Sequence, residues 1–400
     1  MIFNNFLKTI HKLCILKVVE FNFLLIKNKM SFFMITRKKK VIIAMSGGVD
    51  SSVAAWFLKK NDYLVEGLFM KNWEENDKEN YCHAAEDLYD AENVCKKLNI
   101  YLHKINFSQE YWEQVFKNFL NEYKKGNTPN PDILCNKEIK FKLFFNYAVE
   151  HLQADYIATG HYARILKKNG INYLLKAIDR NKDQSYFLYT LQSHQLERIL
   201  FPIGAFKKNK IRMIAKKIGL KVAEKKDSTG ICFIGPKNIN NFLSYYIKEK
   251  KGNIVTINGE IIGSHNGLFY YTLGQRKGLK IGGMKDKYNM PWYVVSKNIQ
   301  TNSLIVAQGL SNPYLMSIGL IAEKINWINN IKFKLPFFCK AKTRYRQNEV
   351  SCQIKYIDNL YIKILFDIPI IAVTPGQSVV FYLSDTCIGG GIIKCKLPLL

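Results

Sequence analysis

The hydrophobic pattern of the first half of the chain alternates between short apolar runs and apolar positions at helical spacing. Residues 41–45 are an unbroken apolar run, and Val53, Ala54, Phe57 and Leu58 then recur at the spacing of a helix. Strands and helices in alternation require crossovers, so the pattern predicts an α/β domain with a mostly parallel sheet. The predicted strands are 41–45, 64–70, 101–107 and 156–159, and the predicted helices are 51–60, 84–98, 111–125, 141–152 and 208–218.

Beyond about residue 235 the pattern changes to short apolar runs separated by glycine and asparagine. Many short strands with turn residues between them are typical of an antiparallel β domain, and here predict a β-barrel. The predicted strands are 254–257, 260–262, 292–296, 303–307, 340–346, 350–356, 361–366, 378–383 and 388–393.

These patterns divide the chain into four expected parts. They are an N-terminal extension at 1–39, an α/β domain at 40–235, a small linking domain at 236–305 and a β-barrel at 306–400. The extension lacks the single apolar region and small-residue cleavage site of a secretory signal. Because Met30 and Met34 stand just before the basic run ITRKKK, we expect translation to start at one of them and the preceding residues to be dispensable.

Charge adds a candidate partner. The chain has 59 basic and 32 acidic residues and a formal charge of +27, which favours a polyanion such as nucleic acid. Arginine contributes only eight of the basic residues, so a proteome biased toward lysine, asparagine and isoleucine would produce a similar excess without selection for binding.

Cysteine usage and hydropathy indicate the compartment. The nine cysteines are spread along the chain and include no CxxC pair, which favours reduced thiols in a cytoplasm and gives no support for a zinc or iron–sulfur site. No run of about 18 apolar residues occurs, so we expect no membrane span. We therefore expect a cytoplasmic protein without a stable bound metal.

The stretch VIIAMSGGVDSS, residues 41–52, is the first candidate site. A glycine-rich turn between a parallel strand and a helix presents backbone N–H groups and the positive end of the helix dipole to an anion. Asp50 is a candidate ligand for Mg²⁺, and the serines at 46, 51 and 52 are candidate donors to phosphate oxygens. No GxxxxGK[ST] loop occurs, so this is not a Walker loop. The alternative is a purely structural turn.

Two cysteines stand in unusual surroundings. Cys135 follows the proline-rich turn TPNPDIL, and nearby helix N–H groups with Lys137 and Lys140 are expected to lower its pKa, while Asp132 is placed to manage a proton. Cys232 lies in the loop DSTGICFIG. Either cysteine alone is also compatible with inert packing, but two loop thiols beside a phosphate site favour sulfur chemistry.

The motifs together resemble a known family. SGGVDSS is similar to the loop of the PP-loop ATP pyrophosphatases, which cleave ATP between its α and β phosphates. From about residue 40 to 400 the chain resembles the tRNA-specific 2-thiouridylases, in order, through AMSGGVDSS, GLFMKNW, TPNPDILCNKEIKF, ATGHYA, NKDQSYFLYTL, KDSTGICFIG, YTLGQRKGL, KTRYRQ, TPGQSVVFY and CIGGGII. Two small departures are Ala44, where a glycine is usual, and Ile388, where a leucine is usual.

The resemblance implies a function and a role for each motif. It implies ATP-dependent thiolation of the wobble uridine of tRNA, with Cys232 carrying a persulfide from a cysteine desulfurase or relay protein and Cys135 as the second catalytic thiol. The residues implied to bind ATP, with Mg²⁺, are Ala44, Met45, Ser46, Gly47, Gly48, Val49, Asp50, Ser51, Met70 and Gly160. Those implied to meet the target base or the rest of the tRNA are Asn130, Pro131, Asp132, His161, Lys182, Asp183, Gln184, Arg344, Tyr345 and Gln377.

Several alternatives stay open. The KDQS run is also compatible with a solvated helix start, TRYRQ with an exposed strand face, and His161 with a structural histidine. The persulfide sulfur either attacks C2 of the uridine directly or leaves as sulfide when Cys135 attacks it, and both routes end in a Cys135–Cys232 disulfide. Another PP-loop tRNA-modifying enzyme, a ligase that adenylates a small molecule, or an RNA-binding module without chemistry are the competing functions.

Overall fold

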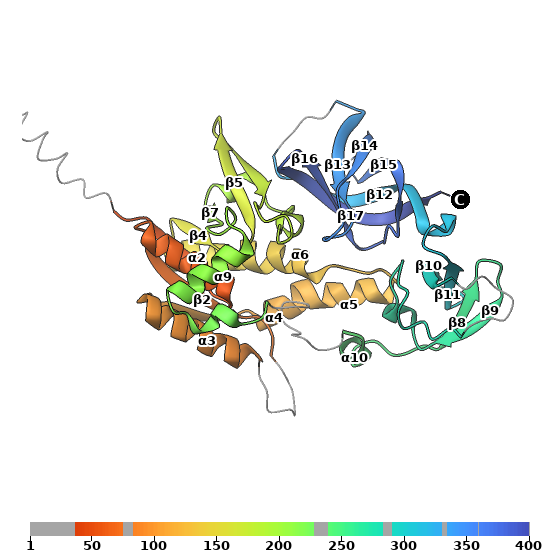
Figure 1. Ribbon diagram of the computed structural model, residues 1–400, viewed down its shortest axis with the longest axis horizontal. Coiled ribbons are helices and arrows are strands. Elements are labelled where there is room, and N and C mark those ends of the chain that lie inside the picture. Colours follow the sequence, from red (N-terminus) through yellow and green to blue (C-terminus); the bar gives the residue numbers. More distant parts are fainter. Residues whose placement is uncertain are drawn as a thin grey trace, which may run out of the picture. The chain divides into compact units, whose positions relative to one another are not determined.

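The computed structural model describes residues 37–399 apart from 75–82, 228–238, 283–289, 330–333 and 359 (Figure 1). The chain divides into a unit at residues 1–39 and a compact unit at residues 40–400. All described helices and strands belong to the second unit.

The first half is built on a five-stranded sheet. Its strands lie in the order β3 (Leu102–Asn106), β2 (Leu64–Lys71), β1 (Lys40–Ala44), β4 (Tyr156–Ala158) and β7 (Ile199–Leu200). Every neighbouring pair is parallel, which confirms the predicted α/β architecture. The carboxyl ends of β1 and β4 are therefore adjacent at one edge of the sheet, where ligand sites of open α/β sheets gather.

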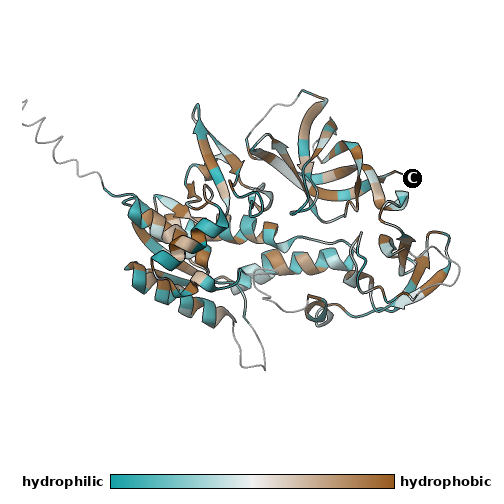
Figure 2. Ribbon diagram, in the orientation of Figure 1, coloured by the Kyte–Doolittle hydropathy of each residue, from teal (hydrophilic) through white to brown (hydrophobic). Residues whose placement is uncertain are grey.

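Helices cover both faces of this sheet because its central strand is apolar on both sides. Val41 and Ile43 of β1 pack with α2 (Val49–Lys60), α3 (His83–Leu98) and α9 (Lys208–Lys217). Ile42 packs with the helical segments between residues 108 and 150. Figure 2 shows hydrophobic residues concentrated along the strands and hydrophilic stripes on the helices, as expected for a sheet buried on both faces.

Two helical stretches on the second face differ from the predicted ones. The first comprises α4 (Ser108–Tyr111), a wider π-type stretch at Trp112–Phe116 and α5 (Lys117–Lys124). The second begins ten residues before the predicted 141, as α6 (Pro131–Cys135), and continues through a π-type stretch at Asn136–Leu143 into α7 (Phe144–Glu150). Asn130 caps it by accepting from the N–H of Asp132 at 3.1 Å, and Pro131 occupies the first turn, where its missing N–H costs nothing.

An antiparallel hairpin inside the α/β half was not predicted. Strands β5 (Ala163–Lys168) and β6 (Ile171–Lys176) are joined by Asn169 and Gly170, both with positive φ. An Asn-Gly pair between two alternating runs is the strongest short-range signal for such a hairpin, so the sequence did contain it.

The second half contains two further β structures. Residues 252–308 form a mixed sheet of β8 (Gly252–Thr256), β9 (Ile261–His265), β10 (Trp292–Asn298) and β11 (Ser303–Gln308), in the order β10-β11-β8-β9. Its core includes Ile254, Val294, Leu304 and Val306. The short helix α10 (Ile239–Ser244) precedes this sheet and packs against the α/β half.

The last part is a closed antiparallel barrel, as predicted. Its strands are β12 (Met316–Trp327), β13 (Phe337–Lys342), β14 (Val350–Ile357), β15 (Tyr361–Ile371), β16 (Ser378–Leu383) and β17 (Thr386–Pro398). The order is β12-β15-β14-β13-β16-β17, and pairing of β17 with β12 closes it. The strand predicted at 340–346 ends at Lys342, because Thr343 to Gln347 form a turn closed by the Gln347 side chain on the N–H and hydroxyl of Thr343. The long strand β12 was not predicted.

The barrel sheet continues into the first half of the chain. Thr386 and Cys387 of β17 pair with Leu175 and Leu174 of β6. Tyr382 and Val380 of the barrel share a buried cluster with Leu174 and Tyr186. The two halves are thus joined by backbone pairing and by a common core.

Every helix in the described ranges is too short or too polar to cross a bilayer.

Candidate active site

The turn between β1 and α2 has the geometry of an anion site. Gly47 has a φ of +70°, and Gly48 caps α2 without any side-chain hydrogen bond, so the first-turn N–H groups of a 12-residue helix are presented to a ligand. Ser51 organises the turn: its hydroxyl lies 3.2 Å from that of Ser46 and from the carbonyl of Gly48.

Two neighbours hold this turn at close range. A Cβ at Gly47 would lie 2.3 Å from the carbonyl oxygen of Asp87 in α3. A Cβ at Gly160, just after β4, would lie 2.7 Å from the backbone nitrogen of Ser51. Both glycines therefore allow backbone to approach backbone. The other predicted nucleotide contacts surround the turn: Met45 and Val49 are buried, and Ala44 and Met70 are half-buried near the ends of β1 and β2.

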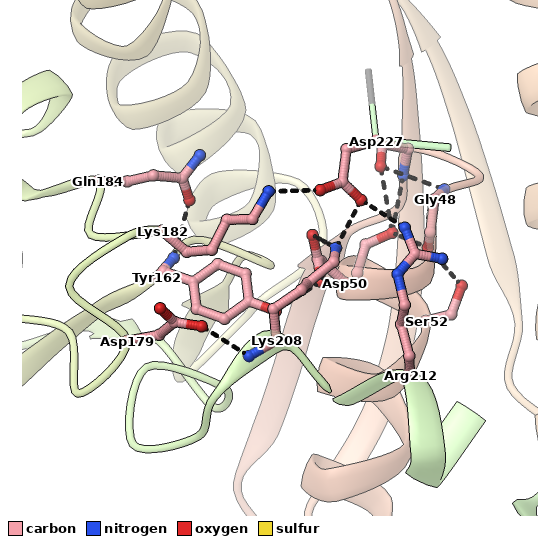
Figure 3. Close-up of polar contacts among 12 residues, drawn as sticks. Gly48, Asp50, Ser52, Tyr162, Asp179, Lys182, Gln184, Lys208, Arg212 and Asp227 are labelled. Carbon is pink, nitrogen blue, oxygen red and sulfur yellow. Dashed lines mark hydrogen bonds and ion pairs between the residues drawn. The ribbon is translucent and has the colours of Figure 1, made fainter. Parts of the chain in front are cut away.

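Asp50, in the first turn of α2, is engaged by two side chains. The Lys208 ammonium lies 2.8 and 2.7 Å from its two oxygens, and the Tyr162 hydroxyl donates to Oδ1 at 2.8 Å (Figure 3). Burial and the nearby Asp50 raise the pKa of Tyr162, which keeps it a donor. Since Lys208 and Tyr162 already occupy both carboxylate oxygens, the residues present do not fit the predicted Mg²⁺ ligand role of Asp50. The described residues contain no group of three or more His, Cys, Asp or Glu that could hold a metal.

Asp227 extends the same cluster. It lies 2.7 Å from Lys182 and 2.8 Å from both Lys208 and Arg212 (Figure 3). Burial alone would raise the pKa of Asp227, but hydrogen bonds from Lys182 and Lys208 outweigh it and lower the pKa to about 2. Three cations and two carboxylates thus lie beside the N-terminus of α2, an arrangement that can neutralise a polyphosphate.

Much of this cluster was not predicted as part of the nucleotide site. Lys182 was expected only at the tRNA, and four residues were not expected at all: Tyr162, Lys208, Arg212 and Asp227. Tyr162 stands next to His161 in the motif ATGHYA, and Asp227 stands in the motif KDSTGICFIG, whereas Lys208 and Arg212 lie outside the quoted motifs. All four lie far from SGGVDSS in sequence. The fold brings them to the carboxyl edge of the sheet.

Cys135 is the last residue of α6 and is completely buried. It belongs to the core cluster that includes Ile42 and Ile157, on the face of the sheet opposite α2. Of the lysines expected beside it, Lys137 is exposed and pairs with Glu138 at 3.3 Å. Asp132 lies one turn earlier on the same helix and is half-buried.

Cys232 lies outside the described residues, and the described chain before it ends at Asp227. Lys225 pairs with Asp87 at 2.8 Å and with Asp90 at 2.5 Å, both on α3. Asp227, five residues before Cys232, is part of the ion cluster beside α2. The described chain therefore lies beside the β1–α2 turn at Asp227, its last described residue before Cys232.

His161 is buried at 9% exposure between Phe141 and Phe201. Its Nδ1 lies 2.7 Å from the Thr159 hydroxyl. Burial, with the charge of Lys140 adding to it, holds the pKa of His161 well below 6.5, so the ring is neutral. A neutral ring packed in this way has the environment of a structural histidine.

The partners of residues 182–184 include a charged side chain and backbone N–H groups. Lys182 joins the ion cluster, whereas Asp183 is buried and accepts from the N–H groups of Ala177 and Ser185 at 3.0 and 3.2 Å. Gln184 accepts from the Tyr162 N–H at 2.8 Å. The Asp183 carboxylate therefore has partners within the protein, and its contact with tRNA stays a prediction.

The remaining predicted contacts gather where the α/β half meets the second half. Arg344 donates to the carbonyls of Leu273 and Ala372, both at 2.8 Å, and Gln377 donates to the carbonyl of Thr128 at 2.6 Å. Tyr345 packs at 4.4 Å from the Phe187 ring, and burial raises its pKa to about 12. Asn130 caps α6 and Pro131 begins it, two and three residues after Thr128, the partner of Gln377.

Three family models match consecutive parts of the chain. They are described as the tRNA methyl transferase HUP domain at residues 39–236, the tRNA methyl transferase PRC-barrel domain at 240–308, and the aminomethyltransferase beta-barrel domain at 317–393.

Curated relatives match over nearly their whole length. The chain is 71% identical to the tRNA-specific 2-thiouridylase MnmA of Buchnera aphidicola subsp. Schizaphis graminum, covering 92% of this chain and 100% of the relative. It is 58% identical to the protein of that name from Salmonella typhi, covering 90% and 98%. Among solved structures, a U34-tRNA thiolase NcsA from Methanococcus maripaludis matches with a TM-score of 0.33 at 16% identity, over 49% of this chain and 63% of that one.

Proposed function

The chain belongs to the tRNA-specific 2-thiouridylases, and from this we propose that it forms 2-thiouridine at the wobble position of tRNA in an ATP-dependent reaction. The single observation that carries the proposal is the match to these enzymes over essentially their entire length. The descriptions of two family models contain the words methyl transferase, whereas the relatives, which cover at least 90% of the chain at 58–71% identity, are named 2-thiouridylases. The phosphate turn and its ion cluster supply the independent structural support.

We assign the β1–α2 turn to the phosphates of ATP. The N–H groups at the start of α2 are placed to bind a phosphate, and Lys208, Lys182 and Arg212 are placed to neutralise pyrophosphate as it leaves. Met70 and Gly160 complete the proposed nucleotide site. Mg²⁺, if it accompanies ATP, would have to bind phosphate oxygens, since Lys208 and Tyr162 occupy Asp50. Cleavage between the α and β phosphates would transfer AMP to O2 of the uridine.

We assign sulfur delivery to Cys232 and the second thiol role to Cys135. Adenylation makes the uridine oxygen a good leaving group, so that a persulfide sulfur or a released sulfide can replace it at C2. The products are 2-thiouridine, AMP, pyrophosphate and a Cys135–Cys232 disulfide, which a reductant must reopen. Cys232 follows Asp227 by five positions, a length of chain that spans at most about 18 Å, so Cys232 is tethered to the proposed phosphate site.

We assign the tRNA to a surface shared by both halves. Asn130, Pro131 and Asp132 are proposed to meet the uridine, which leaves its anticodon stack cheaply because the loop is single-stranded. The charge of +27 supports a polyanionic substrate. A cysteine desulfurase or relay protein is the proposed persulfide donor, and the cytoplasm is the proposed compartment.

The test is nucleoside analysis. Unmodified tRNA is incubated with the protein, ATP, cysteine and a cysteine desulfurase, and its nucleosides are separated by mass spectrometry. We expect 2-thiouridine with the wild-type chain and none with Cys135→Ser or Cys232→Ser. Cys395→Ser, a half-buried cysteine of β17, is the matched control and should retain activity.

Two results would count against the proposal. Wild-type amounts of 2-thiouridine with both cysteine variants would remove the thiols from the mechanism. ATP–pyrophosphate exchange with a small acid in the absence of RNA would favour an adenylating ligase instead.

A further inference from the structure

Residues 126–128 connect α5 to α6 and lie immediately before the segment from Asn130 to Cys135. Within the first half, this connection is held through Asn127, whose N–H and side-chain amide donate to Glu122 at 3.0 and 2.7 Å. The Gly126 N–H also donates to the carbonyl of Tyr123 in α5 at 2.9 Å. The remaining contacts described for residues 126–128 come from the second half of the chain.

The mixed sheet contacts the connection at Gly126. The Lys297 ammonium of β10 donates to the Gly126 carbonyl at 2.9 Å. A Cβ at Gly126 would lie 2.5 Å from the end of the Ile299 side chain, so the two parts are in close contact there. Lys297 is half-buried, and burial lowers its pKa to about 8. A methionine at this position would not carry that desolvation cost.

The barrel forms hydrogen bonds with the connection at Thr128. The Thr128 N–H donates to the carbonyl of Pro375 at 3.0 Å, and the Gln377 side chain donates to the Thr128 carbonyl at 2.6 Å. Both backbone groups of Thr128 are thus paired with one barrel loop. Gly376, with a φ of +88°, lets that loop come close: a Cβ there would lie 2.9 Å from the Cβ of Asn127.

Arg344 connects the two parts of the second half that contact residues 126–128. Its Nη2 lies 2.8 Å from the carbonyls of Leu273 and Ala372 and 3.0 Å from the Thr374 hydroxyl. Leu273 lies next to Thr272, whose hydroxyl lies 3.4 Å from that of Thr128, and Thr374 directly precedes the barrel loop. Arg344 therefore ties the two structures together at the point where both reach residues 126–128.

We propose that Lys297 and Gln377 are positioning residues that hold residues 126–128, and through them the start of α6 and Cys135, in the arrangement needed for thiolation. The expected effect on the thiolation rate rests on the proposed function, whereas the structural role of Lys297 and Gln377 does not. This role differs from the direct tRNA contact expected of Gln377, and no role was expected of Lys297.

The first test does not depend on activity. The rate of Cys135 alkylation by iodoacetamide is measured by peptide mass spectrometry in the full chain, with Cys95, a buried thiol of α3, as internal reference. Lys297→Met and Gln377→Ala should each raise the Cys135 rate about tenfold, the effect of losing roughly one hydrogen bond from a local opening equilibrium. The Cys95 rate should not change.

Matched controls remove the same chemistry elsewhere. Lys251→Met removes an exposed lysine of the mixed-sheet part, and Gln353→Ala removes a glutamine of barrel strand β14. Both should alkylate at the wild-type rate. Lys297→Arg, which keeps a donor, should recover most of the protection. Wild-type Cys135 rates in both Lys297→Met and Gln377→Ala would overturn the proposal whether or not the protein is a thiolase.

The second test separates positioning from binding. We measure the single-turnover rate of 2-thiouridine formation at saturating tRNA and divide it by the fraction of protein that binds ATP. This rate should fall about tenfold or more in both variants, because small misplacements of reacting groups slow a reaction strongly. The Kd for tRNA should stay within about twofold, since neither change removes an exposed phosphate contact. Weaker tRNA binding with a wild-type rate would make Gln377 a direct tRNA contact and overturn its positioning role.

Discussion

At the scale of single residues, Lys208 is the centre of the proposed ATP site. It is 6% exposed and lies within 2.8 Å of two carboxylates, Asp50 and Asp227, that are far apart in sequence. A buried cation with two partners is costly to remove alone, because both carboxylates are then left without their compensating charge. Its position next to the first turn of α2 also places it where phosphate charge must be neutralised.

We expect Lys208→Met to lower the free energy of unfolding by roughly 3 kcal/mol, within the range for breaking a buried ion pair. It should also reduce thiolation at least about 100-fold, by analogy with the loss of other charge-stabilising donors. Urea denaturation and the nucleoside assay measure the two effects. Lys210→Met, an exposed lysine of the same helix, should change neither. Normal activity in Lys208→Met would remove this lysine from the site.

His161 gives a pH dependence with a defined sign. Its pKa in the folded protein is lowered below 6.5, so the unfolded chain binds a proton that the folded one excludes. Its contribution to stability is therefore full above about pH 6.5 and decreases as the pH falls below that value. The slope should approach about 1.4 kcal/mol per pH unit.

Denaturation between about pH 5 and 7.5 checks this expectation. His161→Gln should flatten the slope, whereas His194→Gln, at an exposed position, should leave it as in the wild type. An identical slope in wild type and His161→Gln would show that the ring is not held neutral by the fold.

At the scale of elements, the β1–α2 turn distinguishes its two glycines. Gly47 has a positive φ and faces the Asp87 carbonyl, whereas Gly48 has a φ of −93° and its added Cβ would meet only the Ser46 hydroxyl, at 3.4 Å. The two neighbouring glycines are therefore used for different reasons. Only the first is required by the backbone.

We expect Gly47→Ala to lower the free energy of unfolding by about 2 kcal/mol or more, through backbone strain and the displacement of α3. Gly48→Ala should cost less than about 1 kcal/mol, because its conformation is open to any residue. Thermal denaturation of the pair without nucleotide makes the comparison. Equal losses of stability would contradict the assignment of φ and contact to Gly47 alone.

The elements that were predictable from sequence are those with strong local patterns. The strand at Val41 to Met45 and the helix after it are predicted by their hydrophobic periodicity and by the motif SGGVDSS. The barrel is predicted by its many short apolar runs. The hairpin at residues 163–176 was not predicted although Asn169-Gly170 marks it, because it interrupts a region in which strands and helices otherwise alternate. The strand expected to run on to residue 346 ends at Lys342, since the turn depends on a side-chain hydrogen bond from Gln347 that no periodicity reports.

The site was predictable only in part, for a related reason. The turn at residues 46–52 is local and was predicted. The helix cap at Asn130 is also local, although the predicted helix began only at residue 141. Lys208 meets Asp50 and Asp227 only through the fold, and Gln377 meets Thr128 across 249 residues of sequence. Such pairs depend on tertiary structure, which a short motif does not encode.

At the scale of the whole molecule, the two halves share one core. Tyr382 of β16 is fully buried with Leu174 of β6 and with Tyr186, and its hydroxyl lies 3.3 Å from that of Ser185. The β6–β17 pairing adds backbone hydrogen bonds across the same boundary. A substitution that destabilises the barrel should therefore also destabilise the α/β half.

We expect Tyr382→Ala to cost about 3 to 5 kcal/mol, as for other buried aromatic truncations. Hydrogen exchange should become faster in residues 171–176 and 185–191 as well as in β16. Leu383→Ala, the next residue along and 41% exposed, should leave exchange in the α/β half unchanged. Faster exchange confined to the barrel would show that the halves are energetically separate.

The pairing of β6 with β17 also has a consequence during protein synthesis. Leu175 is joined to Thr386, so one edge of β6 waits for about 210 further residues to be translated before its partner strand exists. At roughly 5 to 20 residues per second, the delay is on the order of 10 to 40 seconds. Throughout it, a nascent chain carries an open strand edge next to the apolar Leu174. During the interval between the synthesis of these two strands the open edge exposes the chain to aggregation, and a ribosome-associated chaperone that covers it would protect the chain.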